Sequence, residues 1–307
     1  LEDVGYLPRV AFVLDRCFAR AGAHGRQSLT MCMGLGCNAC GVMGCRIIDS
    51  PRERLIAMLT NCFVPCNGRF PLLITLLCVF FSGTSMLGAA VGLLAALVFS
   101  VCVTLTVSRL LSATLLRGES SSFSLELPPY RRPRVGQVLV RSLLDRTVYV
   151  LGRAVTVAAP AGLVIYLLGN CNVGEMTLLA RCAAALDPLG RLMGLDGMIL
   201  LAFLLGFPAN EIVLPILLMG YCSAGTLVDC TSLAQLRTLL CANGWTGATA
   251  LCMMLFSLLH FPCGTTTLTL ARETKSARWT LLGVVLPTAV GIAACIFVHS
   301  AAALMGF

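Results

Sequence analysis

Two short interruptions in apolar sequence combine cysteine thiols with residues that break helices. One runs from Gly34 to Cys40 and reads Gly-Leu-Gly-Cys-Asn-Ala-Cys; the other runs from Asn61 to Gly68 and reads Asn-Cys-Phe-Val-Pro-Cys-Asn-Gly. Gly and Pro break helices, and a break at membrane depth exposes backbone carbonyls that can bind a polar substrate. Thiols, carbonyls and Asn oxygens together suit a borderline divalent cation in transit. The pattern predicts an ion path with Cys37 and Cys66 among its ligands.

The second half of the chain carries a similar pair of interruptions. Gly206-Phe207-Pro208-Ala209-Asn210-Glu211 lies within one apolar run, and His260-Phe261-Pro262-Cys263 ends another. Each half therefore has a Gly-centred break followed by an aromatic-Pro-Cys break. Corresponding broken helices in two halves are typical of transporters built from repeats, whose site lies near the midplane between the repeats. We expect Cys263 to join the two thiols of the first half.

Glu211 is the carboxylate that stands inside an apolar run. A charge at membrane depth is costly, so such a residue is a functional hypothesis by default, and here it would balance the charge of the ion or relay a proton. The alternative is a local ion pair or a protonated structural Glu. For the thiols, the alternative is that they pack as small apolar side chains, as we expect for Cys40.

Three further polar residues lie at the breaks. Asn38 and Asn210 would supply oxygens or cap the broken helices. His260 would bind a metal, or it would be a hydrogen-bonded structural residue on an apolar helix. The sequence contains no Gly-x-x-x-x-Gly-Lys-Ser/Thr loop, so we do not expect this chain to hydrolyse nucleotides or to be an enzyme.

The composition is that of an integral membrane protein. Of 307 residues, 58% are hydrophobic and 12% are charged, whereas about a quarter of the residues of soluble domains are charged. Mean hydropathy is +0.90. We expect an all-α, polytopic transmembrane bundle of about six to eight spans or half-spans, with broken or re-entrant helices, most plainly around Gly206.

The net charge of +8 comes almost wholly from arginines between the apolar runs. This distribution fits the positive-inside rule and argues against a nucleic-acid partner. Residues 120–146 form a basic connector that we place on the cytoplasmic side. It would separate a first membrane half, residues 1–119, from a second, residues 147–307.

Six motifs in order make the chain resemble the membrane part of the ferrous iron transport protein B (FeoB) family. They read LEDVGYLPRVAFVLDR, GLGCN, NCFVPCNGRFP, LPPY, GFPANE and FPCGTTTLTLARE. The resemblance implies a multi-pass transporter of Fe2+ in the bacterial inner membrane, with two so-called Gate regions, here one per half. Carried over by motif, its functional residues are Cys37, Cys66, Cys263 and Glu211.

The resemblance also implies partners. Family members carry a cytoplasmic G domain, through which GTP would act; this sequence shows none, so we expect a fragment or a truncated relative. Its expected partners are the lipid bilayer, Fe2+, a G domain or G protein, small Feo accessory proteins and further copies of itself. Two other functions stay open: a regulatory or accessory membrane subunit that partners a G protein, and a Gate-type carrier of nucleosides or organic ions.

Three positions depart from the family pattern. Asn210 stands where Lys is usual, His260 where an aromatic hydroxyl residue is usual, and Cys40 where a small residue or Pro is usual. These departures bear on which metal the path would select.

Overall fold

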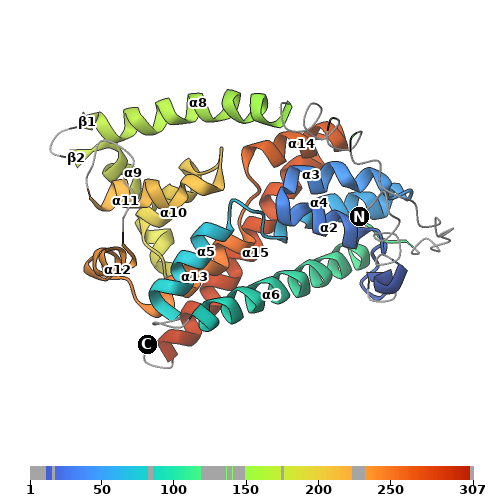
Figure 1. Cartoon of the computed structure of the whole chain (residues 1–307), viewed down its shortest axis with the longest axis horizontal. Coiled ribbons are helices and arrows are strands. Elements are labelled where there is room, and N and C mark those ends of the chain that lie inside the picture. The colour runs from blue at the N-terminus through green and yellow to red at the C-terminus, as the bar shows by residue number, and fades with distance from the viewer. Residues whose placement is uncertain are drawn as a thin grey trace. The chain divides into compact units, whose positions relative to one another are not determined.

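The computed structural model describes residues 12–15, 18–81, 86–118, 136, 140, 149–173, 176–222 and 232–304, and these residues are mainly helical (Figure 1). The all-α prediction is confirmed at this level; the exception is a two-stranded antiparallel hairpin of β1 (Asn172–Val173) and β2 (Met176–Thr177). The elements up to residue 113 are α2 (Gln27–Gly36), α3 (Asn38–Gly44), η1 (Cys45–Ile47), α4 (Pro51–Thr60), η2 (Asn61–Phe63), α5 (Phe70–Leu76), η3 (Leu77–Phe81) and α6 (Met86–Ala113).

The later elements begin at residue 149. They are α8 (Tyr149–Asn170), α9 (Leu178–Leu192), α10 (Gly197–Leu205), η5 (Asn210–Ile212), α11 (Val213–Tyr221), α12 (Leu233–Ala242), α13 (Gly247–Leu259), α14 (Gly264–Thr274) and α15 (Ala277–Leu304). The predicted connector, residues 120–146, falls outside the described residues except at positions 136 and 140. Its boundaries and cytoplasmic placement stay predictions.

Contacts divide the chain into two compact units, and each is considered by itself below. The first unit comprises Leu1–Cys66, Phe99–Thr156 and Thr265–Val284, and the second comprises Asn67–Val98, Val157–Gly264 and Val285–Phe307. The two interruptions of the first half thus lie in the first unit, apart from Asn67 and Gly68. Those of the second half lie in the second unit, through Gly264.

Three stretches of the described chain are long and apolar enough to cross a membrane: Leu87–Ala113, Gly247–Thr274 and Ala277–Leu304. A fourth candidate is the pair α9 and α10, which is bent by 111° and is either a broken span or a re-entrant loop. Shorter apolar helices occupy Phe70–Phe81, Ala159–Asn170, Asn210–Tyr221 and Leu233–Ala242. The chain is therefore a membrane protein, while the number of passes and the re-entrant segment around Gly206 stay predictions.

Helix α6 has exposed apolar side chains and buried hydroxyl groups, as expected of a membrane-spanning helix. In the second unit, its residues Leu87, Val91, Leu94 and Val98 are 56 to 74% exposed. In the first unit, its Ser100, Thr104 and Ser108 are at most 1% exposed. Apolar side chains outside and hydroxyls inside suit a helix whose outer surroundings are lipid.

The Gly34–Cys40 interruption separates two short helices, α2 and α3. Cys37 ends α2 and precedes α3 in an extended conformation, with φ −155° and ψ 123°. Helix α4 starts with two local signals: the Ser50 hydroxyl accepts a hydrogen bond from the Glu53 amide at 3.5 Å, and Pro51 occupies the first turn.

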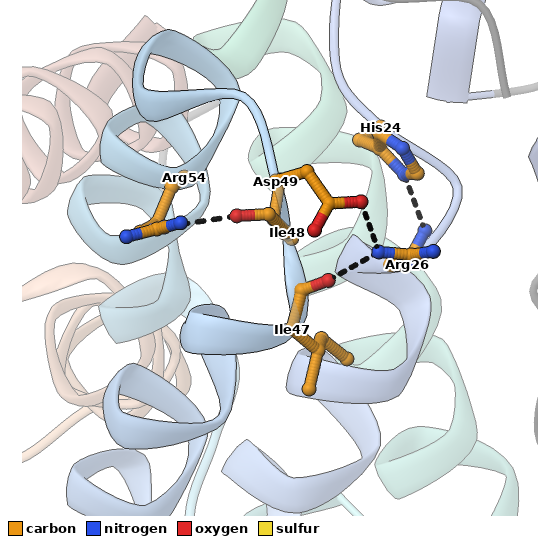
Figure 2. Close-up of polar contacts among 6 residues, drawn as sticks. All are labelled: His24, Arg26, Ile47, Ile48, Asp49 and Arg54. Carbon is orange, nitrogen blue, oxygen red and sulfur yellow. Dashed lines mark hydrogen bonds and ion pairs between the residues drawn. The ribbon is translucent and has the colours of Figure 1, made fainter.

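Arg26 ties the start of α2 to the loop that precedes α4 (Figure 2). Its Nη1 donates to the Ile47 carbonyl at 2.5 Å and to the Asp49 carboxylate at 2.7 Å, while its backbone amide donates to His24 Nδ1 at 3.1 Å. Arg54 holds the same loop through the Ile48 carbonyl at 2.9 Å. The hydrogen bonds of Arg26 and Arg54 thus connect the start of α2 and helix α4 to the same loop, residues 47–49.

Stability should fall with acid through His24. Burial is the main cause that lowers the pKa of His24 below its usual value, Glu53 opposes it, and Arg26 acts in the same direction as burial. The unfolded chain therefore binds a proton first as the pH falls below about 6.5, and the folded state loses stability there. Thermal unfolding of the purified protein should occur at lower temperature at about pH 5.5 than at about pH 7.5.

The matched control is His24→Asn, which keeps an acceptor for the Arg26 amide but does not titrate. Its unfolding temperature should change less over the same pH range. Equal changes in the two proteins would show that His24 is not responsible.

Candidate functional site

The first break places one thiol and one amide side by side in the sequence. Cys37 is partly exposed, and Asn38, the first residue of α3, is only 3% exposed. The Cys37 thiol lies close to the thiol of Cys40, one turn further on, and the two interact. Cys40 was expected only to pack as a small apolar side chain. Its thiol also contacts Cys37, a predicted metal ligand.

Asn61 joins the two interruptions of the first unit. Its side chain is buried, with 1% exposure, and its Nδ2 donates to the Asn38 backbone carbonyl at 3.1 Å. The close packing of α2 on α3 depends on Gly41, where a Cβ atom would lie 2.8 Å from the Thr30 carbonyl and would also overlap the Asn61 amide. Asn61 opens the second motif, but its type and position in the sequence do not by themselves indicate this role.

Hydroxyl groups continue this polar interior along α6. Gln27 Nε2 donates to Thr60 Oγ1 at 2.9 Å, and Ser108 contacts the same hydroxyl at 3.4 Å. Ser100 donates to the carbonyl of Phe63, in the second motif, at 2.7 Å. Cys66 follows Pro65 on the same segment and is buried, with 8% exposure.

In the second unit, the two predicted breaks contact each other. The Gly264 amide donates to the Phe207 carbonyl at 2.6 Å, and the rings of Phe207 and Phe261 lie 6.0 Å apart. Glu211 is exposed and lies against Gly68, where a Cβ atom would stand 3.1 Å from Glu211 Oε1. The structure thus brings together the segments that carry Glu211, Cys263 and the end of the Asn61–Gly68 interruption.

A buried guanidinium holds the second of these breaks. Arg69 is 1% exposed and donates to the carbonyls of Leu258 at 2.9 Å, His260 at 3.4 Å and Phe261 at 3.3 Å. These carbonyls are therefore occupied by a cation of the protein, which differs from the expectation that this break leaves its carbonyls for an ion. The signal for Arg69 was present in the sequence: it is an arginine between a Gly and a Phe-Pro pair that opens an apolar run.

His260 is enclosed by aromatic rings and is 1% exposed. Its Nδ1 lies 3.0 Å from the Phe256 carbonyl and 2.9 Å from the Ser257 carbonyl, so the Nδ1 proton is donated to the backbone. The rings of Phe203 and Phe261 lie 4.8 and 5.0 Å from its own. These contacts support the structural alternative, and a role in metal binding stays a prediction.

The described residues contain no group of three or more His, Cys, Asp or Glu side chains that could hold a metal ion. Cys37, Asn38 and Cys66 lie in the first unit, and Asn210, Glu211, His260 and Cys263 lie in the second. The candidate ligands therefore lie at separate breaks along the described chain and do not form one cluster.

Comparisons with known proteins identify relatives of most of the chain. The family model described as nucleoside recognition (Gate) matches residues 1–80 and 151–277, and the model described as ferrous iron transport protein B C terminus matches residues 93–145. A Staphylococcus aureus (strain MSSA476) protein named Fe(2+) transporter FeoB is 30% identical over 298 residues, which cover 94% of this chain and 42% of the relative.

Two further relatives come from other bacteria. A Synechocystis protein named Fe(2+) transporter FeoB is 29% identical over 289 residues, covering 94% of this chain and 45% of that protein. A Porphyromonas gingivalis protein, named as a fusion of Fe(2+) transport protein A and FeoB, is 26% identical over 333 residues. The match covers 93% of this chain and 39% of that protein. The chain spans less than half the length of each. No solved structure matches it.

Replacing Arg69 with Lys should destabilise the protein although it keeps the charge. One ammonium group cannot reproduce the planar fork that reaches three carbonyls, and each buried carbonyl that loses its donor costs about 1 to 3 kcal/mol. We expect the free energy of unfolding to fall by about 2 kcal/mol or more in Arg69→Lys.

Arg237→Lys is the matched control, because Arg237 is exposed on α12 of the same unit. It should unfold like the wild type in denaturant titrations. If Arg69→Lys did the same, the guanidinium contacts would not stabilise this break.

Proposed function

The chain belongs to the ferrous iron transport protein B (FeoB) family, of which it carries the Gate-containing membrane part, and from this premise we propose that it conducts Fe2+ across the bacterial inner membrane. The observation that carries the proposal is the meeting of the broken helices. Within the first unit, the Cys37–Asn38 break contacts the Asn61 segment. Within the second, the Phe207 and Gly264 breaks are hydrogen-bonded to each other.

The residues at these breaks have the chemistry that a transported Fe2+ ion needs. Thiols of Cys37, Cys66 and Cys263 are ligands for a borderline metal, and the Asn38 amide offers an oxygen in place of water. Sites with few ligands favour release as well as binding, which conduction requires. Glu211, exposed in the second unit, balances the charge of the ion or relays a proton.

Other components of the transport system are part of this proposal. GTP acts through a G domain or a separate G protein, and small Feo proteins assist, as the name of the fused Porphyromonas gingivalis relative suggests. The chain works as a homo-oligomer in the bilayer. The division into two Gate halves, with the ion passing between them, stays a prediction.

A second function is favoured by one observation, the description of the Gate family model as nucleoside recognition. A nucleoside carrier would be stabilised by its substrate, by about 2.7 kcal/mol at a hundred times the dissociation constant. Thermal unfolding with nucleosides and with Fe2+ separates the two functions, since each predicts stabilisation by its own substrate alone.

Removing two thiols tests the transport proposal. The chain reconstituted in liposomes should take up radiolabelled Fe2+, and the double variant Cys37→Ser, Cys66→Ser should take it up at least about tenfold more slowly, because a hydroxyl is a poorer ligand for this metal.

The control is Cys102→Ser with Cys171→Ser, two exposed thiols away from the Gly and Pro breaks. This variant should transport at the wild-type rate. Wild-type uptake by the first variant would remove the thiols from the mechanism, and no uptake by the wild type in the presence of a G protein and GTP would contradict the proposed function.

A further inference from the structure

Two buried amide oxygens of the first unit accept no hydrogen bond from the protein. They are Asn38 Oδ1 and Asn61 Oδ1, on side chains that are 3% and 1% exposed. A buried acceptor that lacks a donor costs about 1 to 3 kcal/mol, and such groups in folded proteins call for an explanation. The two oxygens therefore point to something that they bind.

Both oxygens lie at one point of the α2–α3 hairpin. A Cβ atom built on Gly34 would stand 3.0 Å from Asn61 Oδ1 and 3.4 Å from Asn38 Oδ1; Asn61 Nδ2, at 3.2 Å, is the atom that donates to the Asn38 carbonyl. Because Gly34 has no side chain, both oxygens border the same small volume. The orientation of the Asn61 amide is fixed, since its Nδ2 donates to the Asn38 carbonyl and a flipped amide would bring two oxygens together.

The position of this volume relates it to the break. Gly34 lies three residues before Cys37, and Asn38 directly follows Cys37. The third buried oxygen without a donor in the described part of the chain, Gln27 Oε1, belongs to an amide that contacts Thr60, the neighbour of Asn61. Acceptors without donors thus gather in the polar interior of this unit.

We propose that Asn38 Oδ1 and Asn61 Oδ1 form an amide-oxygen site for a divalent cation that has shed part of its water. Two acceptors that share a volume and lack donors favour positive charge, and side-chain amide oxygens are ligands of hard and borderline divalent ions. The amides are neutral, so the ion is held weakly and can move on. That this ion is Fe2+ rests on the proposed function, whereas the site itself does not.

The site adds Asn61 to the residues that the motifs identified and gives Gly34 a role. The Cys37 thiol and the two oxygens would take the ion in turn, a soft ligand next to two hard ones. Gly34 keeps the volume open, which explains a glycine inside α2, where glycine costs about 1 kcal/mol relative to Ala.

Gly34→Ala tests this site with a matched control. The added methyl group enters the shared volume while both Asn side chains remain. Gly36→Ala is the control, because a Cβ atom there meets nothing within 4 Å and the residue is on the same helix. Binding of Mn2+, an air-stable probe that prefers oxygen ligands, is measured on the purified protein by electron paramagnetic resonance.

We expect Gly34→Ala to weaken Mn2+ binding at least about tenfold and Gly36→Ala to leave it unchanged. Asn61→Asp should strengthen Mn2+ binding, because a carboxylate replaces a neutral oxygen; a loss of structure cannot produce that gain. Wild-type affinity in both Gly34→Ala and Asn61→Asp would mean that the oxygens bind water alone, and the inference would be wrong.

Fe2+ uptake separates this inference from the proposed function. If the wild type transports Fe2+ and Gly34→Ala transports it equally well, the site is not on the path and the inference fails while the function stands. If the wild type transports no Fe2+ but the Mn2+ affinities change as expected, the cation site stands and the proposed function fails.

Discussion

Each helix break in a membrane protein leaves backbone groups that must find partners inside the protein, because the hydrocarbon offers none. This chain satisfies them with a small set of polar side chains. In the second unit, Arg69 donates to three carbonyls around the α13–α14 break, and the Gly264 amide donates to Phe207. In the first unit, Asn61 donates to Asn38. The positions of the candidate ligands follow from these bonds.

The two units satisfy their breaks in different ways, and the difference bears on function. A buried guanidinium donates to three carbonyls at the break of the second unit that carries Cys263, and the Gly264 amide of that break donates to the Phe207 carbonyl. The first unit uses the neutral amides of Asn38 and Asn61, and the side-chain oxygens of both accept no hydrogen bond. Two amide oxygens therefore remain without donors, one of them on Asn38, the residue that follows Cys37.

Much of the local structure was readable from the sequence. Gly and Pro placed the breaks at Cys37, after Leu205 and after Leu259, and Ser50 with Pro51 placed the start of α4, since these signals act over one helical turn. The amide partner of the first break was not found, because Asn61 is 23 residues from Asn38. Arg69 was missed for the same reason, since its carbonyls lie about 190 residues away.

The sequence by itself determined the membrane class and the helical fold, and it predicted residues that would bind a metal, since composition and the chemistry of side chains are local properties. Tertiary structure alone decided which of these residues meet and in what state. In the folded chain, His260 Nδ1 is hydrogen-bonded to the backbone, and Arg69 donates to the carbonyls that were expected to bind an ion. Two amide oxygens of the first unit, near Gly34, accept no hydrogen bond. Hydrogen-bond satisfaction depends on residues distant in the chain, so only the folded structure settles it.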